Sequence, residues 1–339
     1  MNTFYQQSLE QQEEQLLRLA YSALPAWGLE GTLSLIKHRE NAVYRLETRD
    51  NQQYALRIHR ANYHSNASLH SELSWVDALQ GCGIDVPNAI PTQNGEFFTI
   101  ASIASVPEPR QIDLLSWVDG KQIGSVEDGL TDSPEQIRKN YYTIGEVAAQ
   151  IHNQASQWST PKNFQRHSWD LDGLVGEQPF WGPFWDLQAL STEQRNLILK
   201  AREAVRAELK QLSTSPEDYS MIHADLVPEN VLVTANSVQI IDFDDAGFGW
   251  HLFEIATALY FIQFDPNYET AKQALIDGYR QHRPMPDEKL AHLPQLMMAR
   301  GFTYLGWAHT RQNTETAQQF TPHLIDLCCK TINQYLPLT

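Results

Sequence analysis

The chain has 339 residues, of which 42% are hydrophobic and 19% are charged, and its formal net charge is −16. This length suits two lobes of ordinary domain size better than one core, and the apolar content excludes a disordered chain. Because nucleic-acid binders carry basic stripes, the acidic charge argues against a nucleic-acid partner.

The sequence shows no targeting or membrane-spanning segment. The N-terminus lacks a basic region followed by an apolar core, so a signal peptide is not expected, and no run of 18 apolar residues occurs. Cys82, Cys328 and Cys329 follow neither zinc nor disulfide spacing. We therefore expect a cytoplasmic protein that does not enter a membrane.

Residues 1–118 predict a small, mainly β lobe. The periodicity of apolar residues predicts two helices joined to short strands by polar turns. The helices are expected over 5–24 and 68–80, and the strands over 32–38, 41–48, 53–60 and 111–117. Asp119-Gly120 then marks a hinge between lobes.

Residues 119–339 predict a larger, mainly α lobe. Ser133 and Pro134 are a cap and a first residue typical of a helix start. A further helix is expected over 192–212, and helical patterns continue to Leu336. Between them, two short strands at 231–234 and 238–241 predict a hairpin with its turn at 234–236.

One stretch, "MIHADLVPENVLV", places polar residues inside an apolar run. They are His223, Asp225 and Asn230. The predicted hairpin would bring Asn230 beside Asp242, which follows the second strand. An amide oxygen and a carboxylate are hard ligands suited to Mg²⁺, and Asp225 is placed to reach the same point.

An acidic base beside a two-ligand Mg²⁺ site is what phosphoryl transfer requires. The carboxylate of Asp225 would orient the attacking hydroxyl and accept its proton. The pattern matches H-x-D-L-x-x-x-N followed by D-F-x in kinases. Capping of turns would explain each polar residue alone, but not the spacing of Asp242.

The first lobe offers a cation for the nucleotide phosphates. Ala55 and Arg57 share one face of a strand, and Glu72 of the next helix is the expected partner of Arg57. The alternative is that Arg57 is a solvated strand residue. A glycine-rich loop is absent, and "KHRENAVY" occupies its place, with Asn41 able to bend the backbone.

These blocks resemble the aminoglycoside phosphotransferase and choline kinase superfamily. "MIHADLVPENVLV", "IIDFDDAGFGWHLFEIATAL", "ENAVYRLETRDNQQYALRIHR" and "TIGEVAAQIHNQA" carry the resemblance across most of residues 35–265. The nearest likeness is to bacterial homoserine kinases and to uncharacterised members. The resemblance implies an α+β, bilobal protein-kinase-like fold, with a small antiparallel β lobe bearing one main helix and a larger mainly α lobe.

The resemblance also implies a role for each matching residue. It makes Asp225 the base, Asn230 and Asp242 the Mg²⁺ ligands, Glu254 a support of the catalytic loop, and His223 a structural residue. In the first lobe it makes Arg57 the cation that contacts phosphate, with Glu72 as its partner, and Trp117–Val118 the hinge whose backbone binds adenine. The chain departs from the family pattern at three places. Arg57 and Val227 stand where lysines are usual, and Asp244 and Asp245 add carboxylates.

We therefore predict a kinase that uses ATP and Mg²⁺ to phosphorylate a small-molecule hydroxyl. The acceptor would be an amino alcohol or a homoserine-like, choline-like or aminoglycoside-like compound. The alternatives are a Ser/Thr protein kinase of the same fold, a nucleotide-binding pseudokinase adaptor, and a metal-dependent hydrolase. The short span from Ala246 to Trp250 leaves little room for peptide docking, and the intact Asp225, Asn230 and Asp242 disfavour a pseudokinase.

The identity of the acceptor is not readable from the sequence, and neither are the oligomeric state and the preference for ATP or GTP. The Trp-rich segment 168–187 offers two readings. Trp169, Trp181 and Trp185 would either wall a pocket for a cation or pack in the core. Asp244 would meet a second metal, a cationic substrate or solvent.

Overall fold

The computed structural model describes residues 4–125, 129–234 and 238–336. The chain divides into two compact units, Met1–Asp119 with Pro161–Gln165, and Gly120–Thr160 with Arg166–Thr339. The predicted boundary after residue 118 assigned all of the later chain to the second lobe. The structure groups Pro161–Gln165 with the first unit, where the backbone N–H of Gln165 donates to Ser71 Oγ at 2.9 Å.

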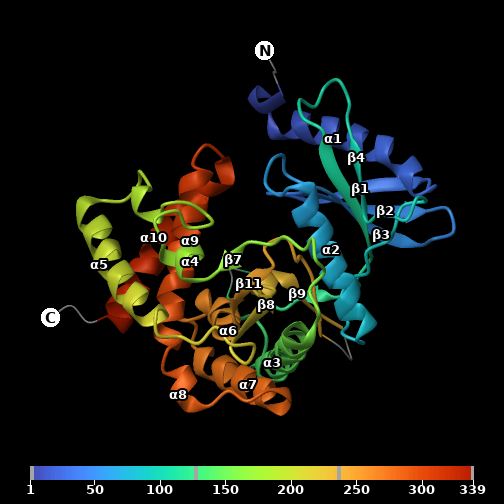
Figure 1. The fold of residues 1–339 in the computed structure, drawn as a ribbon. Helices are drawn as coiled ribbons and strands as arrows, with labels where there is room; N and C mark the ends of the chain where they lie inside the picture. The colour runs from blue at the N-terminus through green and yellow to red at the C-terminus, as the bar shows by residue number, and fades with distance from the viewer. Residues whose placement is uncertain (1–3, 126–128, 235–237, 337–339) are drawn as a thin grey trace. The chain divides into compact units, whose positions relative to one another are not determined.

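The first unit is built on one antiparallel sheet (Figure 1). Its order is β1-β2-β3-β5-β4, from β1 (Gly31–His38), β2 (Ala42–Thr48), β3 (Gln53–Ile58), β4 (Phe98–Ala101) and β5 (Arg110–Ser116). The expected first helix is shorter than predicted, because a 3₁₀ turn at Phe4–Gln6 precedes Ser8, whose side chain caps α1 (Leu9–Ala23).

Each face of this sheet is covered by one helix. Leu56 and Ile58 of β3 belong to the core that α1 completes. Ala55 lies on the opposite face, against the buried leucines of α2 (Asn66–Gly81). The period-2 alternation therefore sends Arg57 toward α2 and away from the main apolar core. This placement puts a charged strand residue beside Glu72.

The second unit is mainly helical. Its helices are α3 (Pro134–Gln157), α4 (Leu171–Val175), α5 (Thr192–Leu209), α6 (His251–Tyr260), α7 (Tyr268–His282), α8 (Asp287–Leu290), α9 (Leu293–Thr310) and α10 (Glu315–Tyr335). The largely buried α9 packs against α5, α6 and α10. Helices α3 and α7 pack so closely at Gly278 that a Cβ atom on this residue would lie 1.9 Å from the carbonyl oxygen of Tyr142.

Two small sheets position the polar residues of the second unit. The first joins β6 (Lys121–Gln122), β9 (Val231–Val233) and β10 (Val238–Ile240), and the second joins β7 (Ser168–Trp169), β8 (Tyr219–Ile222) and β11 (Gly247–Trp250). The predicted hairpin is present as the antiparallel pair β9–β10. Its predicted turn at 234–236 extends into 235–237, outside the described residues. None of the helices in the described part of the chain has the length and hydropathy needed to span a bilayer.

Candidate active site

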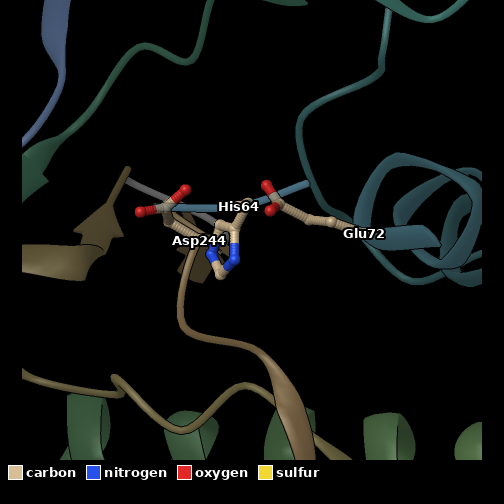
Figure 2. Close-up of side chains that lie close together, drawn as sticks. All are labelled: His64, Glu72 and Asp244. Carbon is tan, nitrogen blue, oxygen red and sulfur yellow. The ribbon is translucent and has the colours of Figure 1, made fainter. Parts of the chain in front are cut away.

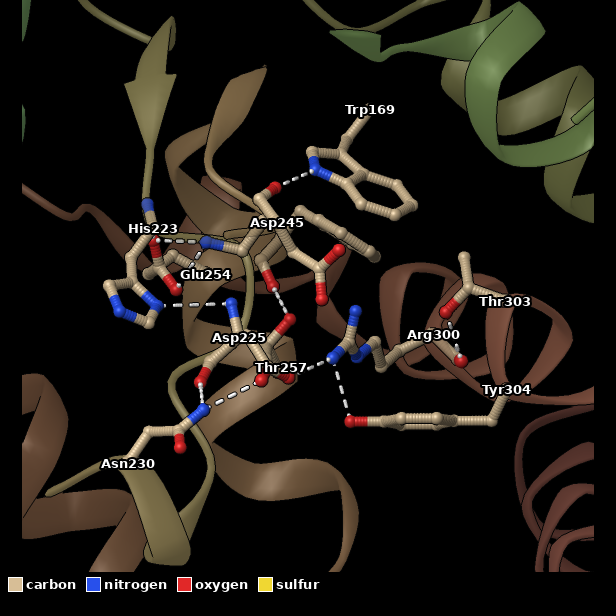
Figure 3. Close-up of polar contacts among 12 residues, drawn as sticks. Trp169, His223, Asp225, Asn230, Asp245, Glu254, Thr257, Arg300, Thr303 and Tyr304 are labelled. Carbon is tan, nitrogen blue, oxygen red and sulfur yellow. Dashed lines mark hydrogen bonds and ion pairs between the residues drawn. The ribbon is translucent and has the colours of Figure 1, made fainter. Parts of the chain in front are cut away.

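The turn after β8 carries Asp225 and has a strained backbone. Ala224 has a φ of 63°, a left-handed conformation that residues with a Cβ rarely adopt. Glu254 of α6 accepts the backbone N–H of His223 at 2.6 Å and that of Ala224 at 3.1 Å (Figure 3). Burial raises the pKa of the Glu254 carboxyl, and its hydrogen bonds with the two N–H groups oppose that shift. One buried carboxylate therefore holds the turn in its unfavourable conformation.

His223 connects this turn to the end of β10. Its Nδ1 accepts the backbone N–H of Asp225 at 3.2 Å, so its Nε2 carries the proton and donates to the carbonyl of Ile241 at 3.0 Å. Burial lowers the pKa of His223, which keeps the ring neutral. Both ring nitrogens of His223 are therefore engaged with the backbone, and its structural role stays a prediction.

Asp225 and Asn230 are in direct contact. Asn230 Nδ2 donates to Asp225 Oδ2 at 2.6 Å and to the Asp225 carbonyl at 3.0 Å. Figure 3 shows that the Asn230 amide oxygen points away from Asp225. Because both hydrogen bonds use the nitrogen, this oxygen is left to serve as a ligand.

The hairpin brings Asp242 to the same region of the second unit. The backbone N–H of Ile241 donates to the carbonyl of Asn230 at 3.0 Å, so the residue after Ile241 lies beside Asn230, as predicted. Asp242 is exposed and has a φ of 69°. The amide oxygen of Asn230 and the carboxylate of Asp242 are oxygen donors of the kind that Mg²⁺ prefers.

A buried arginine from α9 reaches the proposed base. Arg300 Nη2 donates to Asp225 Oδ1 at 2.9 Å and to the Tyr304 hydroxyl at 2.7 Å (Figure 3). Burial raises the pKa of Asp225 to about 8; Arg300 opposes this shift, whereas Asp245 and Asp242 reinforce it. Sequence reasoning missed both Arg300 and Tyr304. The available signal was a single charge in the otherwise apolar stretch "LMMARGF".

The loop that follows Asp242 is held by hydrogen bonds from other side chains to its backbone carbonyl groups. Arg166 donates to the carbonyls of Asp244 and Ala246, both at 2.5 Å. Trp169 Nε1 donates to the carbonyl of Asp245 at 2.9 Å. Asp244 is 6% exposed, so of the alternatives left open for its side chain, exposure to solvent is wrong. Segment 166–169 therefore fixes the path of the loop that follows the proposed metal ligand.

The Trp-rich segment is packed within the second unit. Trp169 is fully buried and contacts Trp181 and Phe253. The Arg300 guanidinium carbon lies 5.2 Å from the ring centre of Trp181, and that of Arg202 lies 4.2 Å from the ring centre of Trp185. Two of the three tryptophans that were candidates for a cation pocket thus face arginines of the chain itself.

In the first unit, Arg57 lies in a buried ionic cluster. Its Nη2 donates to Glu72 Oε1 at 2.9 Å, so the predicted pair is formed. Arg57 also forms a bidentate pair with Asp113 of β5, at 2.9 Å and 2.6 Å, and His59 Nε2 lies 2.9 Å from Asp113. The exposed fraction of Arg57 is 6%, so the alternative of a solvated strand residue is wrong.

Asp113 explains why an arginine occupies this position. Arg57 and Asp113 are opposite each other in the β3–β5 register. A guanidinium can bind one carboxylate with two nitrogens and still reach a second, which an ammonium cannot do with the same geometry. Burial raises the pKa of Asp113, but Arg57 and His59 outweigh it and lower the pKa to about 2. The carboxylate therefore stays charged inside the unit.

The remaining nucleotide-site candidates have local partners in the first unit. Figure 2 shows the Glu72 side chain extending from α2, and a ring nitrogen of His64 lies within 4.8 Å of a Glu72 carboxylate oxygen. Asn41 Oδ1 accepts the backbone N–H of Arg60 at 3.0 Å. Trp117 Nε1 donates to Asp119 Oδ1 at 3.0 Å, and Val118 between them is half-buried.

Residues 32–285 match the sequence pattern of the phosphotransferase enzyme family. The chain belongs to this family. The resemblance read from the motifs is thereby confirmed, and with it an enzyme that transfers phosphate to an alcohol group. Its α+β, protein-kinase-like fold is confirmed by structures that share it over nearly the whole chain.

Several members of the family are similar over most of this phosphotransferase. Amicoumacin kinase of Bacillus subtilis is 23% identical over 311 residues, or 88% of this chain and 86% of that protein. Homoserine kinase of Agrobacterium fabrum is 25% identical over 232 residues, or 66% and 63%. A microcompartment-associated aminopropanol kinase is 28% identical, with a TM-score of 0.82 over 94% of this chain and 97% of that one. The amicoumacin kinase hAmiN, solved with AMP-PNP, Ca²⁺ and Ami, shares the fold at 19% identity and a TM-score of 0.73, over 98% and 96%.

Proposed function

We propose that this phosphotransferase moves the γ-phosphate of ATP to a hydroxyl of a small molecule, with Asp225 as the general base. The acceptor O–H gives its proton to Asp225 while its oxygen bonds to the γ-phosphorus. The bond from that phosphorus to the β–γ bridging oxygen breaks, and ADP leaves. The observation that carries the proposal is the Asp225 carboxylate, bound on one oxygen by Arg300 and on the other by Asn230.

We propose Asn230 and Asp242 as the residues that would hold Mg²⁺. The amide oxygen of Asn230, which has no hydrogen bond within the described residues, and the exposed carboxylate of Asp242 supply the hard donors that this ion requires. The ion, when bound, neutralises phosphate charge. Glu254 and His223 would maintain the turn that carries Asp225, through the hydrogen bonds described above.

In the first unit, Arg57, Glu72, Asn41, Trp117 and Val118 remain the proposed nucleotide-binding residues. The ion pair between Arg57 and Glu72 supports this assignment, because kinases pair a strand cation with a helix glutamate in the same way. The adenine contacts proposed for Trp117 and Val118 rest on the family resemblance. The cytoplasmic location also stays a prediction.

For the acceptor we propose an amino alcohol. The support is the likeness to a microcompartment-associated aminopropanol kinase, at 28% identity over 94% of this chain. Homoserine-like, choline-like and aminoglycoside-like acceptors are the rival classes. We propose that the buried side chain of Asp244 contacts either a second metal or a cationic substrate.

A small acceptor is also favoured over a protein substrate. Strand β11 begins at Gly247, two residues after Asp245, and pairs with both β7 and β8. The segment that would dock a peptide in a protein kinase is therefore replaced by a strand inside a sheet. The retained Asp225, Asn230 and Asp242 count against a pseudokinase adaptor.

The test is phosphorylation of a panel of amino alcohols, homoserine, choline, sugars and aminoglycosides with ATP and Mg²⁺, for the wild type and Asp225→Asn. We expect Asp225→Asn to lower kcat by about 10²–10⁴-fold and to leave the Kd for ATP unchanged. Asp326→Asn, an exposed carboxylate on α10, is the control and should behave as wild type. Wild-type turnover in Asp225→Asn would show that the base is misassigned.

A further inference from the structure

We propose that Arg300 is the positioning residue of the catalytic base: it holds the Asp225 carboxylate in the orientation needed for proton abstraction. This inference rests on the proposed function. It concerns a residue of α9, 75 positions along the chain from Asp225, that has no counterpart in the kinase motif.

The Asp225 carboxylate is bound from two sides. Arg300 Nη2 donates to Oδ1 at 2.9 Å, and Asn230 Nδ2 donates to Oδ2 at 2.6 Å. Two donors on different oxygens fix the plane of the carboxylate as well as its position. The Asp225 side chain is 21% exposed, so it stays reachable while Arg300 anchors it from the buried side.

Aromatic rings hold the guanidinium itself in place. The Arg300 guanidinium carbon lies 4.3 Å from the ring centre of Tyr304, 5.2 Å from that of Trp181 and 5.8 Å from that of Phe253. The Tyr304 hydroxyl accepts from the same nitrogen that binds Asp225. The cation therefore has little freedom to move away from the carboxylate.

The hydrogen bonding of Arg300 is incomplete, which argues that the residue serves a purpose other than stability. Arg300 is fully buried, and in the described part of the chain its Nε and Nη1 have no hydrogen-bond acceptor. Removing a cation from water without satisfying its donors is costly. The charge itself is balanced, because Asp225 binds Nη2 and Figure 3 shows the carboxylate of Asp245 on the side of the guanidinium away from Tyr304.

Direct binding of the acceptor by Arg300 is the main alternative. The fully buried guanidinium presents no surface to an acceptor in this structure. Its donors to Asp225 and Tyr304 both come from Nη2. Arg300 is therefore placed to act through Asp225, and its loss should lower the rate of phosphoryl transfer more than substrate binding.

The test compares Arg300→Met and Arg300→Lys with Arg202→Met in the full chain. Arg202 is a matched control, because it is also buried, lies over a tryptophan ring and pairs with Glu177. We expect Arg300→Met to lower kcat about 100-fold. The KM for ATP should change less than about 3-fold, and the kcat of Arg300→Lys should be roughly tenfold higher than that of Arg300→Met. Arg202→Met should keep kcat within about 3-fold of wild type.

A double-mutant cycle with Asp225→Asn separates positioning from general stabilisation. If Arg300 acts through Asp225, Arg300→Met should change the single-turnover rate of Asp225→Asn by less than about 3-fold. A 100-fold loss in both backgrounds, or wild-type kcat in a folded Arg300→Met, would overturn the inference. If Arg300→Met does not fold, Arg300→Lys takes its place in the same cycle. A loss of kcat seen with Asp225 but not with Asp225→Asn supports positioning. An equal loss in both backgrounds, or no loss in either, overturns it.

The outcomes also distinguish this inference from the proposed function. No phosphoryl transfer by the wild type to any acceptor, or wild-type turnover in Asp225→Asn, would contradict the proposed function itself. A large loss in Asp225→Asn together with wild-type kcat in Arg300→Met would contradict the positioning role alone.

Discussion

Replacing Glu254 tests how the strained turn before Asp225 is maintained. Glu254 accepts the buried N–H groups of His223 and Ala224. In Glu254→Ala both donors lose their acceptor, and each unsatisfied group costs about 1–3 kcal/mol. The left-handed conformation of Ala224 costs about 1–2 kcal/mol in wild type and variant alike, so it does not add to the difference between them. Relief of the buried carboxylate returns part of this sum, so we expect a net loss of about 3 kcal/mol in the free energy of unfolding.

Glu254→Gln separates the hydrogen bonds from the charge. The Oε2 atom accepts both N–H groups, at 2.6 Å and 3.1 Å, and Oε1 also accepts that of Ala224 at 3.2 Å. An amide oxygen in place of Oε2 preserves the first two contacts, whereas the amide nitrogen in place of Oε1 loses the third. Charge-assisted hydrogen bonds are roughly twice as strong as neutral ones, so we expect a loss of about 1 kcal/mol.

Urea unfolding measures the free energy of unfolding of each variant, and steady-state kinetics measure kcat. We expect Glu254→Ala to lower kcat by about 10²-fold, because Asp225 follows the released turn directly. An unchanged unfolding midpoint in Glu254→Ala would refute the reasoning. Equal losses of stability in the Gln and Ala variants would also refute it, because the amide would then preserve nothing.

Two further predictions concern buried ionisable groups. Arg57→Lys should lower the free energy of unfolding by about 2 kcal/mol, because an ammonium cannot keep the bidentate pair with Asp113, and urea unfolding that matches wild type would contradict this. Burial, with a smaller effect of Arg283, lowers the pKa of His152 from 6.5 to about 3. The folded form thus stays neutral where the unfolded chain takes up a proton, so stability is full above pH 6.5 and is lost as the pH falls. We expect His152 to account for about 2 kcal/mol between pH 6.5 and about pH 5, and for His152→Gln to remove that share of the slope of urea stability against pH.

Sequence patterns predicted the local elements of the site well. The apolar strands around "MIHADLVPENVLV" and "VQIIDF" led to the β9–β10 hairpin and to the contact between Asn230 and the residues at the end of β10. The pair of Arg57 and Glu72 followed from strand alternation and the next helix. These relations depend on residues close in sequence, where periodicity sets which side chains share a face. The roles of these residues in binding and catalysis remain predictions.

Residues distant in sequence were not predictable in this way. Asp113 and Arg300 each appear as a lone charge in an apolar segment, and such a pattern does not show which partner the charge will meet. Asp113 meets Arg57 through the β3–β5 register, and Arg300 meets Asp225 because α9 is buried in the second unit. The two readings of the Trp-rich segment were also separated only by packing, which places Trp181 and Trp185 over arginines of the chain.

The sequence by itself determined the family, the helices α1, α2, α3 and α5, most strands of the first unit, the β9–β10 hairpin, and the spacing of Asp225, Asn230 and Asp242, because these depend on local periodicity and on short connections. Tertiary structure decided how the proposed base is held: by Arg300 on one oxygen and by a turn that Glu254 keeps in a left-handed conformation. The physical reason is that a buried charge is tolerated only where packing supplies its counter-charge and its donors, and packing joins residues that no local pattern relates.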